Sequence, residues 1–161
     1  MRPSFLIASM VLAVVGQTLL GRYTGMSRYI DLFLIVTVYA SLYTSRVSSV
    51  LTGASCGLLQ DLLNGTMLGV HGIAKAMIGY GLGAFSLKFM LTSRWGEATC
   101  LVGASIFDAA ILQLLGQLLN LGAQGPGLQL GRAVGTMLVG FVLFNTLNRI
   151  RPIQATHQVP D

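Results

Sequence analysis

The sequence predicts an all-helical integral membrane protein with six transmembrane helices and both termini in the cytoplasm. Its 161 residues include ten basic and five acidic side chains, and 53% of its residues are hydrophobic. A soluble domain has about 25% charged residues, whereas this chain has 9%, too few to cover a globular surface. Disorder is excluded as well, because disordered segments are poor in apolar residues. Since a spanning helix takes about 20 apolar residues, six would use about 120 positions and leave only short loops.

Charges and turn residues divide the apolar sequence into six predicted helices. The first lacks a small-residue cleavage pattern at its end, so we predict an uncleaved span and not a signal peptide. Arg46 alone divides the second helix from the third, and a short turn suited to an antiparallel hairpin joins the third to the fourth. Residues 1–147 are predicted to form one six-helix domain, and 148–161 a short polar cytoplasmic tail. The predicted helices are Ser4–Leu20, Tyr29–Ser45, Val47–Leu63, Val70–Leu87, Glu97–Leu119 and Leu130–Leu147.

The basic residues predict the orientation, because Lys and Arg concentrate in cytoplasmic loops. With both termini inside, more of them fall on the cytoplasmic side than on the other. Their scatter over both sides, without a basic patch, predicts no nucleic-acid partner. The cytoplasmic set is Arg2, Arg46, Lys88, Arg94, Arg149 and Arg151, and the opposite set is Arg22, Arg28 and Arg132.

Two ladders of small and polar residues predict close packing between the third and fourth helices. Such residues mark helix contacts in lipid, where ordinary hydrophobic burial does not draw helices together. A symmetric turn near Thr66 would place the residues of the two ladders opposite one another in order. The predicted pairs are Asp61 with His71, Gly57 with Lys75, Gly53 with Gly79, and Ser49 with Gly83.

Asp108 lies at the middle of the fifth predicted helix, where an uncompensated charge is expensive. Lys75 lies at a matching depth, so an Asp108–Lys75 pair is predicted, with Asp61 as a competitor for the same lysine. The functional interpretation is an ion or proton pathway, or a ligand site. The packing interpretation is a buried pair that sets helix registry, and it is favoured because a relay needs more ionisable groups.

The remaining polar residues do not point to catalysis. Cys56 and Cys100 lack a CxxC spacing and are expected to be packing residues. The sequence has no nucleophile–base set, phosphate loop or zinc spacing, so we predict no enzyme, no cofactor and no metal. Gln113, Gln117 and Asn120 cluster on a different side of the fifth helix from Asp108. They are expected either to line a contact with a partner helix or to approach the far interface.

The stretch from Gly57 to Val70, followed by Gly79-Tyr80, resembles the MreD family of rod shape-determining proteins. Asp61, Gly65 and Gly69 match the family's pattern of an Asp, a small polar turn with Gly, and a Leu-Gly that enters the next helix. Asp108 matches a later acidic position, whereas Lys75 is not part of the family motif. The candidate residues for packing or interaction are Asp61, Gly65, Gly69, Lys75, Asp108, Gly53, Gly57, Gly79 and Gly83.

The resemblance implies a multi-pass protein of the bacterial inner membrane with a scaffold role in the cell elongation complex. Its implied partners are MreC, membrane lipids and, indirectly, MreB, RodA and its transpeptidase, through which it would help regulate peptidoglycan synthesis and cell shape. The family fold also resembles the substrate-binding subunits of energy-coupling-factor vitamin transporters. A subunit of that kind is the alternative function, although the first helix lacks their Ala-x-x-x-Ala docking pattern. A small channel or proton-coupled transporter is a third class, based on Asp108 and Lys75 alone.

Overall fold

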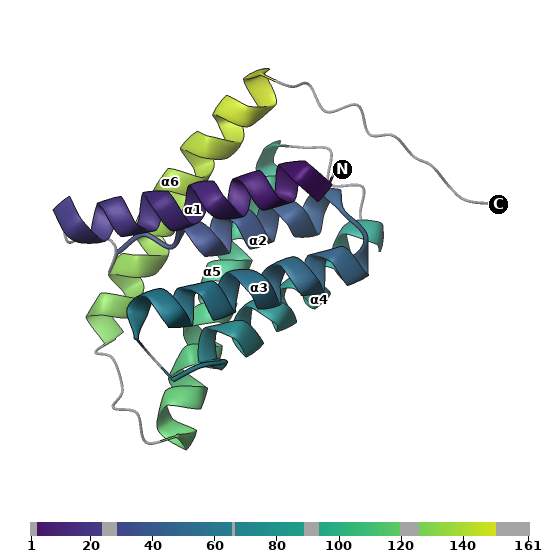
Figure 1. Cartoon of the computed structure of the whole chain (residues 1–161). Helices are drawn as coiled ribbons and strands as arrows, with labels where there is room; N and C mark the ends of the chain where they lie inside the picture. Colours follow the sequence, from purple (N-terminus) through teal and green to yellow (C-terminus); the bar gives the residue numbers. More distant parts are fainter. Residues whose placement is uncertain (1–2, 24–28, 66, 89–93, 120–125, 151–161) are drawn as a thin grey trace.

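The computed structural model describes residues 3–23, 29–65, 67–88, 94–119 and 126–150. All regular secondary structure in these ranges is helical, as the sequence predicts (Figure 1). The last helix continues to Ile150, past its predicted end at Leu147; the rest of the predicted tail, 151–161, lies outside the described ranges. The six helices of the described residues are α1 (Pro3–Tyr23), α2 (Leu32–Tyr43), α3 (Arg46–Asn64), α4 (Val70–Lys88), α5 (Arg94–Leu118) and α6 (Pro126–Ile150).

The short helix α2 is the centre of the fold and packs against α1, α3, α4, α5 and α6. Its residues from Phe33 to Ser41 are almost all buried, whatever side of the helix they lie on. In Figure 1, α1 crosses in front of α2 and α5 passes behind it. A helix that is apolar all round is expected at such an enclosed position.

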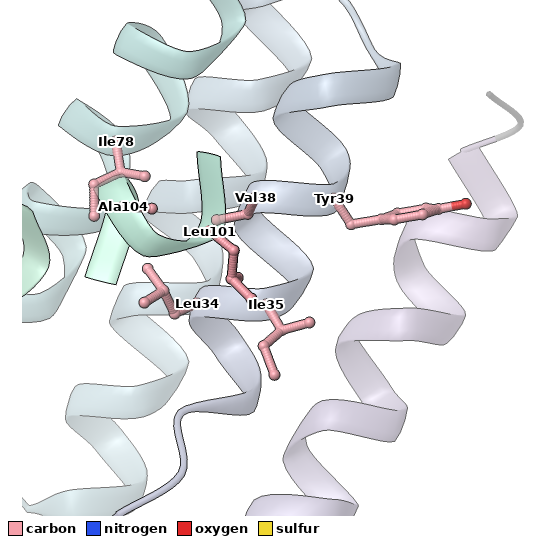
Figure 2. Close-up of a cluster of buried hydrophobic side chains, with 7 residues drawn as sticks. All are labelled: Leu34, Ile35, Val38, Tyr39, Ile78, Leu101 and Ala104. Carbon is pink, nitrogen blue, oxygen red and sulfur yellow. The ribbon is translucent and has the colours of Figure 1, made fainter. Parts of the chain in front are cut away.

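Apolar side chains from α2 enter two clusters. One faces α4 and α5, and in it Leu34 and Val38 meet Ile78 and Leu101 (Figure 2). The other faces α1 and α3 and centres on Phe33. The free thiols of Cys56 and Cys100 are buried, as expected for packing residues. The first cluster comprises Leu34, Ile35, Val38, Tyr39, Ile78, Leu101 and Ala104, and the second Ala13, Phe33 and Cys56.

The helices α3 and α4 form an antiparallel hairpin, the most extensive helix contact among the described residues. Glycines bring the two backbones together: a Cβ on Gly57 would lie 2.5 Å from the Cα of Gly72, and one on Gly79 would lie 2.5 Å from the carbonyl oxygen of Ser49. Gly53 lies in the same way against the carbonyl of Lys75.

Two of the four predicted pairs are in contact, Asp61 with His71 and Ser49 with Gly83. The two glycine pairs between them are offset by about one helical turn. Gly57 lies against His71 and Gly72 where Lys75 was expected, and Gly53 lies against Lys75 where Gly79 was expected. The physical reason lies at the turn, which is not symmetric. The Asp61 carboxylate reaches across it and accepts hydrogen bonds from backbone N–H groups at the start of α4.

Two glycines shape the connection between α3 and α4. Gly65 ends α3 in the left-handed conformation, with φ of 61°, and its N–H donates to the carbonyl of Asp61. Gly69, with φ of 104°, immediately precedes α4. Side chains other than glycine rarely adopt such angles. These two positions explain why the turn needs the glycines that the sequence analysis singled out.

The distribution of polarity is the reverse of that in a soluble protein. Among the described residues, as many polar as apolar side chains are buried, while large apolar side chains are exposed on every helix except α2. By length and composition, α1 and α5 contain stretches able to cross a membrane, Leu6–Tyr23 and Gly96–Leu118. The apolar stretches of α2 and α6 are shorter than those of α1 and α5. In α3 and α4, several polar side chains are buried inside the bundle. Six spans stay a prediction.

We predict that Gly57→Ala destabilises the protein and that Gly81→Ala does not. A methyl group at 57 would overlap the backbone of α4, and overpacking of this kind costs about 1–3 kcal/mol. Gly81, on α4, has open space at its Cβ position, so alanine there should be neutral or raise helix stability by about 0.5–1 kcal/mol. Thermal unfolding of both purified variants in mild detergent measures the difference. Equal melting temperatures would show that the hairpin is not tightly packed.

Candidate functional site

An extended segment leads into α2, and its backbone groups are satisfied by neighbouring helices. The carbonyl of Ile30 accepts from the Gln17 amide of α1 at 3.0 Å, and the N–H of Leu32 donates to the Gln17 side-chain oxygen at 3.3 Å. The N–H of Asp31 donates to the hydroxyl of Thr136 on α6 at 2.9 Å. Non-helical backbone away from water is tolerated where protein groups bind it in this way.

Asp31 begins α2 and is almost completely buried. One carboxylate oxygen caps the helix by accepting from the N–H of Leu34 at 2.9 Å. This side-chain oxygen replaces the helical carbonyl that the first turn lacks. We predicted that the second helix begins at Tyr29. It begins later, at Leu32, because the residue before Leu32 is its N-cap.

The second oxygen of Asp31 joins three other helices. It accepts from the ammonium of Lys75 at 2.9 Å, from the Gln60 amide at 3.0 Å and from the guanidinium of Arg132. The Lys75 nitrogen also lies 3.8 Å from a carboxylate oxygen of Asp108. We call these five residues, Asp31, Gln60, Lys75, Asp108 and Arg132, the Asp31 cluster.

The Asp31 cluster contains two carboxylates and two cations, so its formal charges cancel. Arg132 keeps 17% of its side chain exposed, whereas Lys75 and the two aspartates keep 5% or less. Removing one partner from a buried pair leaves an uncompensated charge, which is strongly unfavourable. The side-chain oxygen of Gln60 and one oxygen of Asp108 have no hydrogen-bond partner in the described residues. Asp108 is therefore the less tightly held of the two acids.

A second polar site stands at the junction of α3 and α4. The carboxylate of Asp61 accepts from the backbone N–H groups of Gly69 at 2.8 Å, His71 at 3.3 Å and Gly72 at 3.4 Å. The Nδ1 atom of His71 lies 2.6 Å from the same carboxylate. Because an ionised carboxylate only accepts, His71 carries a proton on Nδ1. Asp61 thus holds the end of one helix and the start of the next.

The opposite end of α2 has its own polar contact. The hydroxyl of Tyr43 donates to the carboxylate of Glu97, a buried residue in the first turn of α5. The ring of Tyr39 lies 4.9 Å from that of Tyr43, measured between centroids, and extends toward α1 (Figure 2). Polar side chains therefore connect both ends of α2 to its neighbours.

The structure places the predicted residues in two groups. Lys75 approaches Asp108 as predicted, but its closer partner is Asp31, which the sequence analysis did not single out. Asp61 does not compete for Lys75, because it binds His71 and the start of α4. Asp31 lies directly before a long apolar run, which is the signal for an N-cap and the one clue that could have identified it.

Arg132 is a further residue of the Asp31 cluster, and the sequence analysis used it only to predict orientation. We predicted that it faces the outer side and counted it there for orientation. It lies in the second turn of α6 and pairs with Asp31. A basic residue that is neutralised in this way no longer reports on the orientation of a loop.

The ionisable groups of the site are arranged as contacts between helices. Within the described residues, no group of three or more His, Cys, Asp and Glu side chains is placed to hold a metal ion. The buried ionisable groups contact one another, as in the Asp31–Lys75 and Asp61–His71 pairs. A helical bundle with a paired polar interior and an apolar exterior belongs to the class of membrane proteins whose helices are held together by internal polar contacts.

The chain belongs to the MreD family of rod shape-determining proteins, whose family model matches residues 1–144. The resemblance given by the Asp61–Gly69 motif is thereby confirmed. Membership implies a role in rod shape determination; MreD is a membrane-protein family and not a known enzyme family. No curated protein and no solved structure matches the chain. The likeness to vitamin-transporter subunits stays a prediction.

We predict that Asp31→Asn destabilises the protein far more than Asp108→Asn. Asparagine at 31 can still cap α2, so the loss isolates the contacts of the second oxygen, to Lys75, Gln60 and Arg132. Breaking such a buried pair costs about 3–5 kcal/mol. In the described residues, Asp108 forms an ion pair only with Lys75, at 3.8 Å. Asp108→Asn should therefore lower the free energy of unfolding by less than half as much. Chemical unfolding of both variants in the same detergent tests this order, and an equal or reversed order would contradict the central place of Asp31.

We predict that Asp61→Ala opens the junction between α3 and α4 locally. Loss of a helix cap costs about 0.5–2 kcal/mol, and here three backbone N–H groups lose their acceptor. Hydrogen exchange followed by mass spectrometry should show faster exchange in residues 67–73. Asp61→Asn, which keeps one acceptor oxygen, is the matched control and should give a smaller change. Unchanged exchange in Asp61→Ala would show that the carboxylate does not hold this junction.

Proposed function

We propose that this protein is a non-enzymatic scaffold subunit of the bacterial cell elongation complex in the inner membrane. In this role it binds MreC and helps regulate lateral peptidoglycan synthesis. Through MreC it is linked indirectly to MreB, RodA and its transpeptidase. The observation that carries the proposal is the family match over residues 1–144, which implies a role in rod shape.

The use of the buried charges supports a scaffold over a transporter. A transport site needs ionisable groups that can exchange a ligand or a proton. Here Lys75 and Arg132 both bind Asp31, and Lys75 also approaches Asp108. Such mutual pairing favours one arrangement of the helices, which is what a rigid binding platform requires.

The position of the Asp31 cluster is consistent with the proposed topology. The starts of α2, α4 and α6 and the end of α3 lie on one side when α1 begins in the cytoplasm and all six helices cross. The cluster then lies in the outer half of the bilayer. Pairing of Arg132 leaves Arg22 and Arg28 as the outer basic residues, which strengthens the excess of Lys and Arg on the cytoplasmic side.

We predict that depletion of the protein makes rod-shaped cells round, and that it copurifies with MreC from mild detergent. The wild-type copy should restore the rod shape, and Gly81→Ala should restore it equally, because the Cβ position of Gly81 is open. Asp31→Asn should lower both MreC recovery and shape rescue in proportion to its loss of folded protein. Microscopy and quantitative copurification from the same cultures measure these effects.

Two outcomes would contradict the scaffold proposal. Cells that stay rod-shaped after complete depletion would exclude a role of this chain in the elongation complex. Restoration of shape and growth by a vitamin supplement alone would favour the alternative, a substrate-binding subunit. That alternative also requires a metabolite that copurifies and raises the melting temperature of the protein by mass action.

A further inference from the structure

The helix α5 has two faces of different character. Toward the bundle it presents Leu101, Ala104 and Asp108, which are buried. On the other side lie Gly103, Ile106, Ala110, Gln113 and Gln117, and all five are exposed. We call these five residues the α5 seam. The helices α2, α4 and α6 pack against α5 and leave the α5 seam exposed.

The α5 seam repeats with the spacing of a two-helix contact. Gly103, Ala110 and Gln117 are seven residues apart, and Ile106 and Gln113 form the alternate positions of the same repeat. A period of 3.5 residues keeps one face of a helix against a partner helix over its whole length. The Cβ position of Gly103 is open, so a second backbone can approach closely at that point.

The two glutamines are the polar residues of the α5 seam. They lie within Gly96–Leu118, the more apolar of the two stretches that could cross a membrane. Each amide carries two donors and an acceptor, and neither makes a hydrogen bond to the described part of the chain. An amide facing hydrocarbon without a partner is unfavourable, whereas an amide that bonds across a helix contact is stabilised.

We infer that the α5 seam is the contact between two copies of this chain, related by a two-fold axis along the membrane normal. Copies in one membrane share the same orientation, so such an axis places each seam residue opposite its own counterpart. A residue suits that position when it is small or when it both donates and accepts hydrogen bonds. Gly103 and Ala110 meet the first condition, and Gln113 and Gln117 the second.

The charges on α5 agree with self-association. The acidic residues Glu97 and Asp108 are both buried toward the bundle, so no like charges meet across the axis between 96 and 118. A seam that matches itself in size and hydrogen bonding at successive positions fits a second copy better than an unrelated helix. This inference goes beyond the proposed function and does not depend on it.

Disulfide crosslinking in native membranes tests the inference with the full chain. Ala110→Cys and Gln113→Cys should form dimers after mild oxidation several-fold more readily than Leu138→Cys. Leu138 is the matched control, because it is 66% exposed but lies on α6. Wild-type protein gives the background, since its two native cysteines are buried. Seam variants that crosslink no better than Leu138→Cys, or that crosslink only to a protein of another mass, would overturn the inference.

A second variant distinguishes hydrogen bonding from chance proximity. Gln113→Leu combined with Gln117→Leu keeps the surface apolar and should weaken dimerisation about tenfold, the effect expected for lost amide contacts in lipid. Single-molecule photobleaching of labelled protein in lipid nanodiscs prepared over a range of protein densities measures this change. An unchanged dimer fraction would show that the amides do not form the contact.

Discussion

The carboxylate of Asp31 is the group on which the rest of the bundle depends. It is buried at the start of the central helix, where an anion without partners would be highly unfavourable. One of its oxygens is needed by α2 itself as a cap, and the other holds the cations of α4 and α6 and an amide of α3. Four helices are positioned by one side chain. The late start of α2 follows from the same constraint, because its first turn must begin at this acid.

The helices could not be positioned as well by apolar contacts alone. Lipid chains are as apolar as leucine, so apolar side chains gain little by facing another helix instead of the bilayer. Close backbone packing and hydrogen bonds remain as sources of attraction. The α3–α4 hairpin uses both, through Gly57 and Gly79 along its length and Asp61 at its end. This explains why the interior is rich in polar groups while the surface carries the large apolar side chains.

Helix number and type and the hairpin were readable from the sequence, because apolar runs and glycine ladders are local patterns. The contact of Lys75 with Asp108 was readable from matching depths along two helices. Two features were not readable from the sequence. The register of the hairpin depends on Asp61 reaching the N–H groups beyond the turn, which a symmetric turn does not represent. The pairing of Asp31 with Arg132 joins residues about one hundred positions apart, and a charge near the end of an apolar run resembles a loop charge in sequence.

The neutral Asp31 cluster is best understood as a source of specificity. A buried ion pair is often no more stabilising than apolar residues of the same volume, but its partners tolerate few alternative arrangements. In a lipid-exposed bundle, apolar faces alone would permit neighbouring helices to slide by a turn at small cost. A slide of one turn at α4 would carry Lys75 about 5.4 Å from Asp31, well beyond the 2.9 Å at which they meet. The cluster therefore selects one register of α2, α4 and α6, and with it one arrangement of the exposed faces that a partner in the membrane would meet.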